Sequence, residues 1–249
     1  MGQRFGSRSY DISELSTIQN AGATGWYNIK ISGKNVPVYI DQDYDGGGWI
    51  CVLANRRYTA GMNNLKWDDA VYKVNYRHNG TNNATNDRGM KPVANMTLAD
   101  VNIWVGLTFW EALAGRKESG WINVVLYTAS TNGIELNDTS NHTDRHRWKF
   151  NNWTGQFAFQ GATNIATDVG ATSGMYSFHA VNGYALTAYD RDLDANANNC
   201  ATYYNNNPFW YGSCWSGNLF AGGSYVDGPH ITGASNGTSD RQYAGVYIK

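Results

Sequence analysis

The hydrophobic pattern along the chain is dominated by short strand signals. Residues 27–31 alternate apolar and polar side chains, and residues 36–40 follow after a turn-forming stretch, which predicts a β-hairpin. Pro37 lacks an amide hydrogen, so it confines the second strand to a sheet edge or to its first residues. Two apolar runs, residues 49–53 and residues 121–127, predict further strands, the first of them buried on both faces.

Helix signals are fewer. Thr108 and Glu111 have the spacing of a capping box, and the helix that they predict ends at Gly115. Residues 65–72 predict a second short helix. From about residue 185 onward Asn, Gly, Ser and Tyr dominate without a helical or strand period, which predicts ordered loops. Such long loops usually need to be pinned by ligands, disulfides or ions.

Composition narrows the class of protein. The chain has 249 residues, of which 16% are charged and 14% aromatic, and its formal net charge is −1. Disordered chains have fewer aromatic residues, nucleic-acid-binding proteins have an excess of basic residues, and transmembrane helices need about 18 consecutive apolar residues. The sequence therefore predicts a globular protein with no nucleic-acid partner and no membrane insertion.

The chain contains three cysteines, an odd number that leaves at least one thiol unpaired. Cys51 lies within an apolar run and is interpreted as a core residue. Cys200 and Cys214 enclose an aromatic loop, and two interpretations of them remain open. They form either a disulfide that stabilises this loop by roughly 3 kcal/mol or two independent buried thiols.

The most informative segment begins with three alternating acids, Asp190, Asp192 and Asp194. Alternate carboxylates suit Ca²⁺, a hard cation that binds oxygen ligands. An EF-hand has Gly at its sixth position and Glu at its twelfth, where this loop has Ala195 and Ala201, so that motif is excluded. A calcium site and a solvated acidic turn both remain open from these residues alone.

Together these features resemble the fibrinogen-related domain, the fold of fibrinogen globular lobes, ficolins and tachylectins. That family has an acid-x-acid-x-acid calcium loop that ends in Asn-Cys-Ala, followed by paired aromatics, a second cysteine and Asn-Leu. The matching positions are Asp190 to Asp194, Asn199-Cys200-Ala201, Phe209-Trp210-Tyr211, Cys214 and Asn218-Leu219, with Gly25-Trp26-Tyr27 and Asp45-Gly46-Gly47-Gly48-Trp49 upstream.

The resemblance implies an α+β fibrinogen-like fold with a mixed or antiparallel sheet, few short helices and a loop-rich C-terminal calcium-binding lobe at about residues 185–249. Asp192 and Asp194 would supply carboxylates to Ca²⁺, and Asn196 and Asn198 would supply backbone carbonyls. Asp190 would support the loop. The resemblance also implies a Cys200–Cys214 disulfide.

A ligand pocket beside this loop is implied as well, because acetyl-recognising members accept an N-acetyl group on its aromatic residues. The peptide before the second cysteine, here Ser213–Cys214, is often cis in the family. The matching pocket positions are Tyr204, Ser213, Cys214, Trp215, Tyr225 and Val226. Trp215 replaces a usual His at this face. Elsewhere, Ile40 stands where the family has a hairpin cysteine, so the family's first disulfide is expected to be absent.

Catalytic interpretations find little support in the sequence. His142 and His146 have zinc-like spacing on a helix, but their surroundings favour a turn and a strand. Nothing places Glu111 and Glu118 together as a glycosidase pair. No nucleophile-elbow, phosphate-loop or dinucleotide motif occurs. We therefore expect a protein that is not an enzyme.

The sequence thus predicts a calcium-stabilised, lectin-like adhesin that binds a cell-surface glycan or acetylated ligand. The chain opens at Met1 without a signal peptide, so we expect an extracellular or virion-surface setting, as a phage fibre or capsid-decorating protein for host attachment. Residues 1–20 would form an arm that attaches to a virion structural protein, and residues 21–249 a single domain. A homo-oligomer, with a trimer favoured, would add avidity. A structural decoration protein without a glycan site and a secreted innate-immunity lectin are the alternatives.

Overall fold

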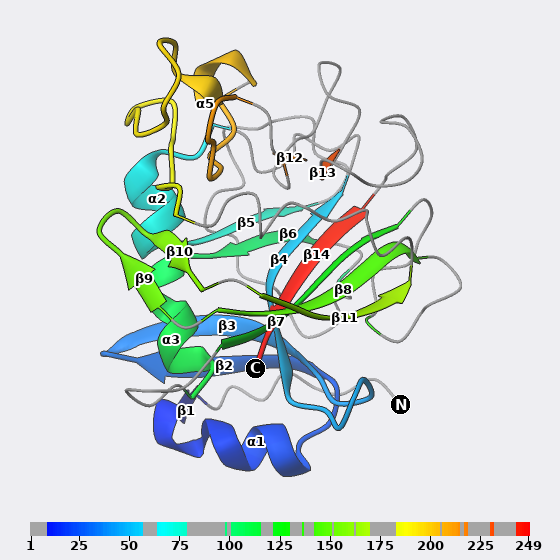
Figure 1. Cartoon of the computed structure of the whole chain (residues 1–249). Coiled ribbons are helices and arrows are strands. Elements are labelled where there is room, and N and C mark those ends of the chain that lie inside the picture. The colour runs from blue at the N-terminus through cyan, green and yellow to red at the C-terminus, as the bar shows by residue number, and fades with distance from the viewer. Residues whose placement is uncertain are drawn as a thin grey trace.

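The computed structural model of the protein describes residues 9–56, 64–78, 98, 101–115, 122–129, 136, 142–150, 152–161, 163–169, 183–204, 206–214, 217–218, 230–231 and 243–249. A large twisted sheet forms the middle of the molecule, with short helices around it (Figure 1). Helix α1 (Leu15–Ala21) lies at one end of the molecule, and the loops around α5 (Cys200–Tyr203) lie at the opposite end (Figure 1).

Among the residues that the structure describes, the main sheet has ten strands, with the order β1-β2-β3-β4-β14-β7-β8-β11 and with β6 pairing both β4 and β5. Strand β1 is parallel to β2, whereas the other pairs in this sheet are antiparallel, so the sheet is mixed. The strands are β1 (Ser9–Asp11), β2 (Gly25–Ile31), β3 (Lys34–Asp41), β4 (Trp49–Arg56), β5 (Val74–His78), β6 (Val101–Val105), β7 (Ile122–Ala129), β8 (His142–Phe150), β11 (Thr163–Val169) and β14 (Tyr243–Ile248).

Two small hairpins lie outside the main sheet. Strand β9 (Asn152–Thr154) pairs with β10 (Ala158–Gln160), and β12 (Gly217–Asn218) pairs with β13 (His230–Ile231), both antiparallel. The first hairpin places Phe157 and its neighbours beside the C-terminal loops, as described below.

The predicted hairpin at residues 27–40 is confirmed as β2 and β3. Its two turn residues, Ser32 (φ 48°) and Gly33 (φ 80°), both have left-handed backbone conformations, which match the twist of the flanking strands. Pro37 pairs with Asn28 of β2 and lies outside the stretch of β3 that pairs with β4. Strand β3 is therefore not an edge strand, and Pro37 lies in its first half, where β4 does not pair with it.

The predicted strands at residues 49–53 and 121–127 are confirmed as β4 and β7. The strand between them, β14, has no counterpart among the sequence expectations. All six residues of β14 are buried, and they pair with β4 on one side and β7 on the other. Cys51 of β4 is a buried free thiol, as expected.

The short helices are α1, α2 (Trp67–Tyr72), the 3₁₀ helices η1 (Ile12–Glu14) and η3 (Leu107–Phe109), α3 (Trp110–Leu113) and α5. Helix α2 confirms the prediction at residues 65–72. The capping box expected at Thr108 is wrong, because Thr108 lies inside η3 and its hydroxyl donates to the Val71 carbonyl oxygen at 2.9 Å. Gly115 (φ 62°) follows the α3 segment, where the sequence places the helix end.

The N-terminal segment differs from the expected arm at residues 1–20. Strand β1 pairs with β2, and Leu15 and Ile18 are buried against the core. Asp11 and Glu14 form a capping box that begins the helical turn between them. Residues 9–20 are therefore part of the folded domain, and residues 1–8 lie outside the described residues.

His142 and His146 lie on strand β8, as their surroundings predict, and not on a helix. The side chain of His146 is fully buried. Among the described residues, no three His, Cys, Asp or Glu side chains gather into a possible metal site. The helical zinc arrangement is therefore excluded for this pair.

Candidate functional site

The candidate site is the C-terminal lobe, which we define as residues 183–204 and 206–214. Within the lobe, Thr187 and Phe209 exchange two backbone hydrogen bonds at 2.9 and 3.0 Å, which join its two segments. Two indole groups attach the lobe to the rest of the protein. The indole of Trp210 donates to the Phe157 carbonyl oxygen at 2.8 Å, and the indole of Trp67 donates to the Leu186 carbonyl oxygen at 3.0 Å. The lobe is thus held by α2 on one side and by the β9–β10 hairpin on the other.

The expected disulfide is present. Cys200 and Cys214 are joined at an S–S distance of 2.08 Å across a sequence separation of 14 residues. Cys200 also begins helix α5, whose N-cap is Asn199. The Asn199 side chain accepts a hydrogen bond from the Thr202 amide at 2.9 Å and donates to the Ala188 carbonyl oxygen at 3.0 Å. The disulfide and this cap fix both ends of the acidic loop.

Asp190 supports the loop, as the resemblance implies, by binding a helix. Its carboxylate accepts a hydrogen bond from the Trp67 amide at 2.9 Å, at the first turn of α2. The N-cap residue of that helix, Lys66, provides no side-chain hydrogen bond. The neighbouring Arg191 guanidinium lies 3.9 Å from the centre of the Trp67 ring, which is a cation–π contact. The start of the acidic loop is therefore bound to α2 twice.

Asp194 organises the centre of the loop. One carboxylate oxygen accepts from the Asn196 amide at 2.9 Å, and the other accepts from the Cys200 amide at 3.0 Å. The Asn196 side-chain oxygen then accepts from the Asn198 amide at 3.0 Å. These are two successive Asx turns, in which a side chain takes the amide two residues ahead. They bend residues 194–200 around the Asp194 carboxylate.

The residues of the acidic loop fit a calcium ion by their chemistry. Asp192 is exposed, and no described residue donates a hydrogen bond to its carboxylate. Asp194, Asn196 and Asn198 follow within the same tight bend. Ca²⁺ binds hard oxygen donors, both carboxylates and carbonyls. A calcium site can therefore combine two carboxylates with backbone carbonyl oxygens and needs no third acidic side chain.

The expected ligand-binding residues fall into three groups. Tyr204 is buried, and its ring stacks on Tyr211 with centroids 5.7 Å apart, so the structure gives it a packing role. Ser213 is exposed and Cys214 is partly exposed, both at the edge of the lobe. The other expected members, Trp215, Tyr225 and Val226, lie outside the described residues.

The expected cis peptide at Ser213–Cys214 is wrong, because the described residues contain no cis peptide bond. The chain turns here by other means. Cys214 has a left-handed backbone conformation (φ 64°), which is rare for residues other than glycine. The Gly212 carbonyl oxygen, two residues earlier, accepts from the Ala195 amide at 3.0 Å and so joins this turn to the acidic loop.

Two exposed tyrosines in the lobe were not expected. Tyr203 is 58% exposed and packs edge-on against Tyr204, and Tyr184 is 41% exposed. The sequence signals an aromatic pair at residues 203–204 without indicating which ring faces solvent. Tyr184 stands alone in a Gly- and Ala-rich stretch, where no periodic pattern reveals its exposure.

Comparison with known proteins assigns the chain to a family. A family model for the C-terminal globular domain of fibrinogen beta and gamma chains matches residues 11–246. The chain therefore belongs to this fibrinogen C-terminal domain family. The expected α+β fibrinogen-like fold, with its mixed sheet and few short helices, is confirmed.

Individual relatives are distant. The chain is 24% identical over 212 residues to the human fibrinogen alpha chain. The matched region covers 80% of this chain but only 20% of that protein. The chain thus spans about a fifth of the length of this relative. The fibrinogen-like globe domain of human ANGPTL6 matches with a TM-score of 0.60 at 19% identity, covering 100% of this chain and 98% of that one. The globe domain of human ANGPTL2 matches with a TM-score of 0.59 at 17% identity, covering 96% of each chain.

Domains of this family often act in ligand binding. Within the part of the chain that the structure describes, no helix is long and apolar enough to cross a membrane.

Proposed function

We propose that this protein is a calcium-stabilised binding module that recognises a carbohydrate or a similar ligand on a surface. The observation that carries the proposal is the acidic loop, which bends around Asp194 and is closed by the Cys200–Cys214 disulfide. A loop built in this way offers carboxylate and carbonyl oxygen atoms to a cation, and the disulfide joins it to the aromatic segment at residues 203–211. The proposal assigns the protein to binding and not to catalysis.

Calcium acts here as a structural ion. Asp192 and Asp194 supply carboxylates, and Asn196 and Asn198 supply backbone carbonyls. The ion neutralises two negative charges that lie two residues apart, and it holds the loop in the bend that the Asx turns already favour. Ligand-binding side chains on either side of the loop are thereby kept in place.

The ligand surface combines exposed aromatic rings with polar loop atoms. Tyr184 and Tyr203 offer rings to solvent, and Ser213 lies exposed beside the disulfide. Aromatic faces bury the apolar face of a sugar or an acetyl methyl group, while a few polar groups fix its orientation. We retain Trp215, Tyr225 and Val226 as further contacts on the basis of the family pattern.

The disulfide supports a setting outside reducing compartments, because such bonds persist in oxidising environments. We propose an extracellular or virion-surface adhesin, with a fibre or capsid-decorating protein for host attachment as one form of it. Oligomerisation, for example as a trimer, would raise the avidity for a repeated surface ligand.

A paired measurement of stability and glycan binding tests the proposal. Asp192→Asn removes one charge but no hydrogen bond between described residues. We expect wild type to melt at a higher temperature in Ca²⁺ than in EDTA, and Asp192→Asn to lose most of that difference. On a glycan array, wild type should bind a defined subset of surface glycans in Ca²⁺, and EDTA should abolish that binding.

Asp68→Asn is the matched control. Asp68 is an exposed acid in the first turn of α2, outside the acidic loop, so this variant should keep the full calcium effect. Identical melting curves in Ca²⁺ and EDTA for wild type would contradict the calcium site. An array without any specific glycan signal would contradict the lectin-like role.

A further inference from the structure

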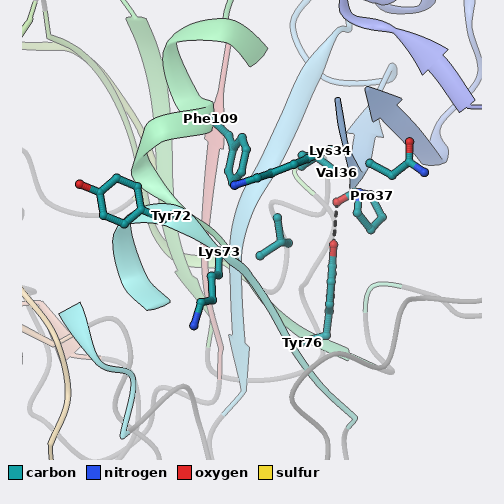
Figure 2. Close-up of a pocket in the computed structure, with 9 residues that line it drawn as sticks. Lys34, Val36, Pro37, Tyr72, Lys73, Tyr76 and Phe109 are labelled. Atoms are coloured by element: carbon teal, nitrogen blue, oxygen red, sulfur yellow. Dashed lines mark hydrogen bonds between the residues drawn. The ribbon is translucent and has the colours of Figure 1, made fainter. Parts of the chain in front are cut away.

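A pocket lies at the C-terminal end of α2, whereas the acidic loop contacts the N-terminal end of this helix. Its volume is about 530 Å³, and it is lined by the start of β3, the end of α2, the start of β5 and Phe109 of η3 (Figure 2). This volume lies within the range of small-molecule sites, about 300–1,000 Å³. The lining elements are two sheet strands and two short helices, so the walls are fixed by regular structure.

The pocket carries uncompensated positive charge. Its lining includes Lys34 and Lys73, and no described lining residue is acidic. Lys73 is paired with the Asp69 carboxylate at 2.5 Å. Lys34 forms no ion pair with any described residue, and it extends across the pocket toward Phe109 (Figure 2). The Lys34 ammonium group is therefore available to an anion, whereas the charge of Lys73 is neutralised by Asp69.

The walls of the pocket are apolar and partly aromatic. Val36 and Pro37 form one side, and the Tyr72 ring, 45% exposed, stands at the opposite rim. Tyr72 packs edge-on against Trp67 with centroids 6.0 Å apart, which restrains its ring. A restrained, half-exposed ring beside a lysine suits a ligand with both an apolar face and a negative charge.

A hydrogen bond between β5 and β3 holds the floor of the pocket in place. The Tyr76 hydroxyl donates to the Pro37 carbonyl oxygen at 3.0 Å and so ties β5 to β3 (Figure 2). Burial raises the pKa of Tyr76 well above its ordinary value, so this hydroxyl keeps its proton. Asn35 follows Lys34 on the strand, so its side chain points to the opposite face, where its oxygen accepts a hydrogen bond from Ser9 of β1 at 2.6 Å.

We propose that this pocket binds an acidic sugar unit, with the carboxylate at Lys34 and the apolar ring face on Tyr72. A carboxylate alone would use only the lysine, and a neutral sugar only the ring. The site is separate from the acidic loop, so it does not rest on calcium or on the function proposed above.

An NMR titration locates and measures this binding directly. Isotope-labelled protein in EDTA is titrated with methyl glucuronoside, with its neutral counterpart methyl glucoside, and with acetate. We expect the glucuronoside to shift the amide signals of Lys34, Val36 and Val74 and to bind about tenfold more tightly than the glucoside, since a charge-assisted hydrogen bond contributes about that factor. Acetate should bind more weakly still.

Variants then assign the contacts. Lys34→Gln should weaken glucuronoside binding about tenfold and leave glucoside binding unchanged. Lys66→Gln is the control: Lys66 is the N-cap residue of α2 and lies outside the pocket lining, so this variant should bind both sugars as wild type does. Tyr72→Ala should weaken both sugars, and Tyr72→Phe should restore them because it keeps the ring.

Five results would overturn the proposal or its assignment to a carboxylate. The first is no shift at millimolar glucuronoside, and the second is equal affinity of wild type and Lys34→Gln. The third is a set of shifts confined to the C-terminal lobe. A sulfated glucose that binds better than the glucuronoside would also overturn the assignment to a carboxylate, as would an acidic peptide that binds better than either sugar.

Discussion

Gly212 shows how much one missing side chain matters in the C-terminal lobe. A Cβ atom at this position would lie 2.5 Å from Cε2 of Tyr184, closer than van der Waals contact allows. The Tyr184 ring therefore rests on the bare backbone of residue 212. The Gly212 carbonyl oxygen also accepts a hydrogen bond from the Ala195 amide, so a backbone shift at residue 212 would displace part of the acidic loop.

Gly212→Ala is expected to destabilise the protein by about 1–3 kcal/mol, because the new methyl group displaces the Tyr184 ring or the backbone. Urea denaturation gives the change in the free energy of unfolding. The matched test is the same substitution in a Tyr184→Ala background, where the ring is absent. A cost that is equal in both backgrounds would show that the clash is not its cause.

At the residue level the sequence predicts identities better than orientations. The family pattern places the Cys200–Cys214 disulfide and the support role of Asp190 correctly. It cannot tell that Tyr204 stacks inward while Tyr203 faces solvent, because adjacent residues of a helical turn differ in direction and the packing of Tyr211 decides between them. The trans peptide before Cys214 depends likewise on the local loop, and no residue type signals it.

Helix α2 is the element that joins the two candidate sites. Asp190 and Arg191 of the acidic loop contact its first residue, Trp67, while Tyr72 at its last turn forms the rim of the pocket. The helix has only six residues and no side-chain cap of its own. Isolated helices of this length are unstable, so tertiary contacts must hold it.

Asp190→Ala is expected to cost about 1 kcal/mol of stability, the usual effect of losing an N-terminal capping carboxylate. The measurement is made in EDTA, so that a calcium effect does not contribute. Asp190→Asn keeps an oxygen acceptor for the Trp67 amide and should recover most of the loss. If Asp190→Ala and wild type unfold at the same urea concentration in EDTA, the cap is not stabilising.

At the level of elements, the sequence predicts the helix at residues 65–72 from local pattern, but not its cap. The capping residue lies 123 positions away along the chain, and only the fold brings it to the helix. The opposite error occurs at Thr108, where the local spacing suggests a capping box. There the hydroxyl finds a better partner in the Val71 carbonyl oxygen of a neighbouring segment.

The whole molecule combines a strongly bonded sheet with a lobe that relies on a few links. Strands β4, β14 and β7 pair over most of their lengths, and most of the side chains that the structure describes in them are buried. The lobe contains one four-residue helix, isolated bridges and the disulfide. Stability is therefore expected to be unequal between the two parts.

Reduction of the disulfide is expected to loosen the lobe before the sheet. A closed loop of about 15 residues contributes roughly 3 kcal/mol in the chain-entropy account. In hydrogen exchange, dithiothreitol should lower the protection of amides at residues 186–209 and leave those of β4 and β14 protected. The double variant Cys200→Ser with Cys214→Ser should behave like the reduced protein and be insensitive to reductant. Equal loss of protection in lobe and sheet would contradict this division.

The overall fold was predictable from the family pattern, but the position of one strand was not. Strand β14 follows a long Gly-, Ser- and Asn-rich stretch, and its six residues carry no alternation because both faces are buried. A short continuous apolar run does not by itself distinguish a strand from a helical segment. The position of β14 between β4 and β7 follows from its pairing with these two strands, and its own residues do not predict that position.

That position bears on how the chain is made. The ribosome delivers β4 and β7 long before residues 243–248, yet these two strands meet through β14 and not through each other. The β4 and β7 sides of the sheet therefore each keep an unpaired edge until β14 is synthesised and inserts between them. Pairing over so long a sequence separation is slow and exposes apolar edges to other chains. The nascent protein should accordingly depend on protection from aggregation until synthesis of β14 is complete.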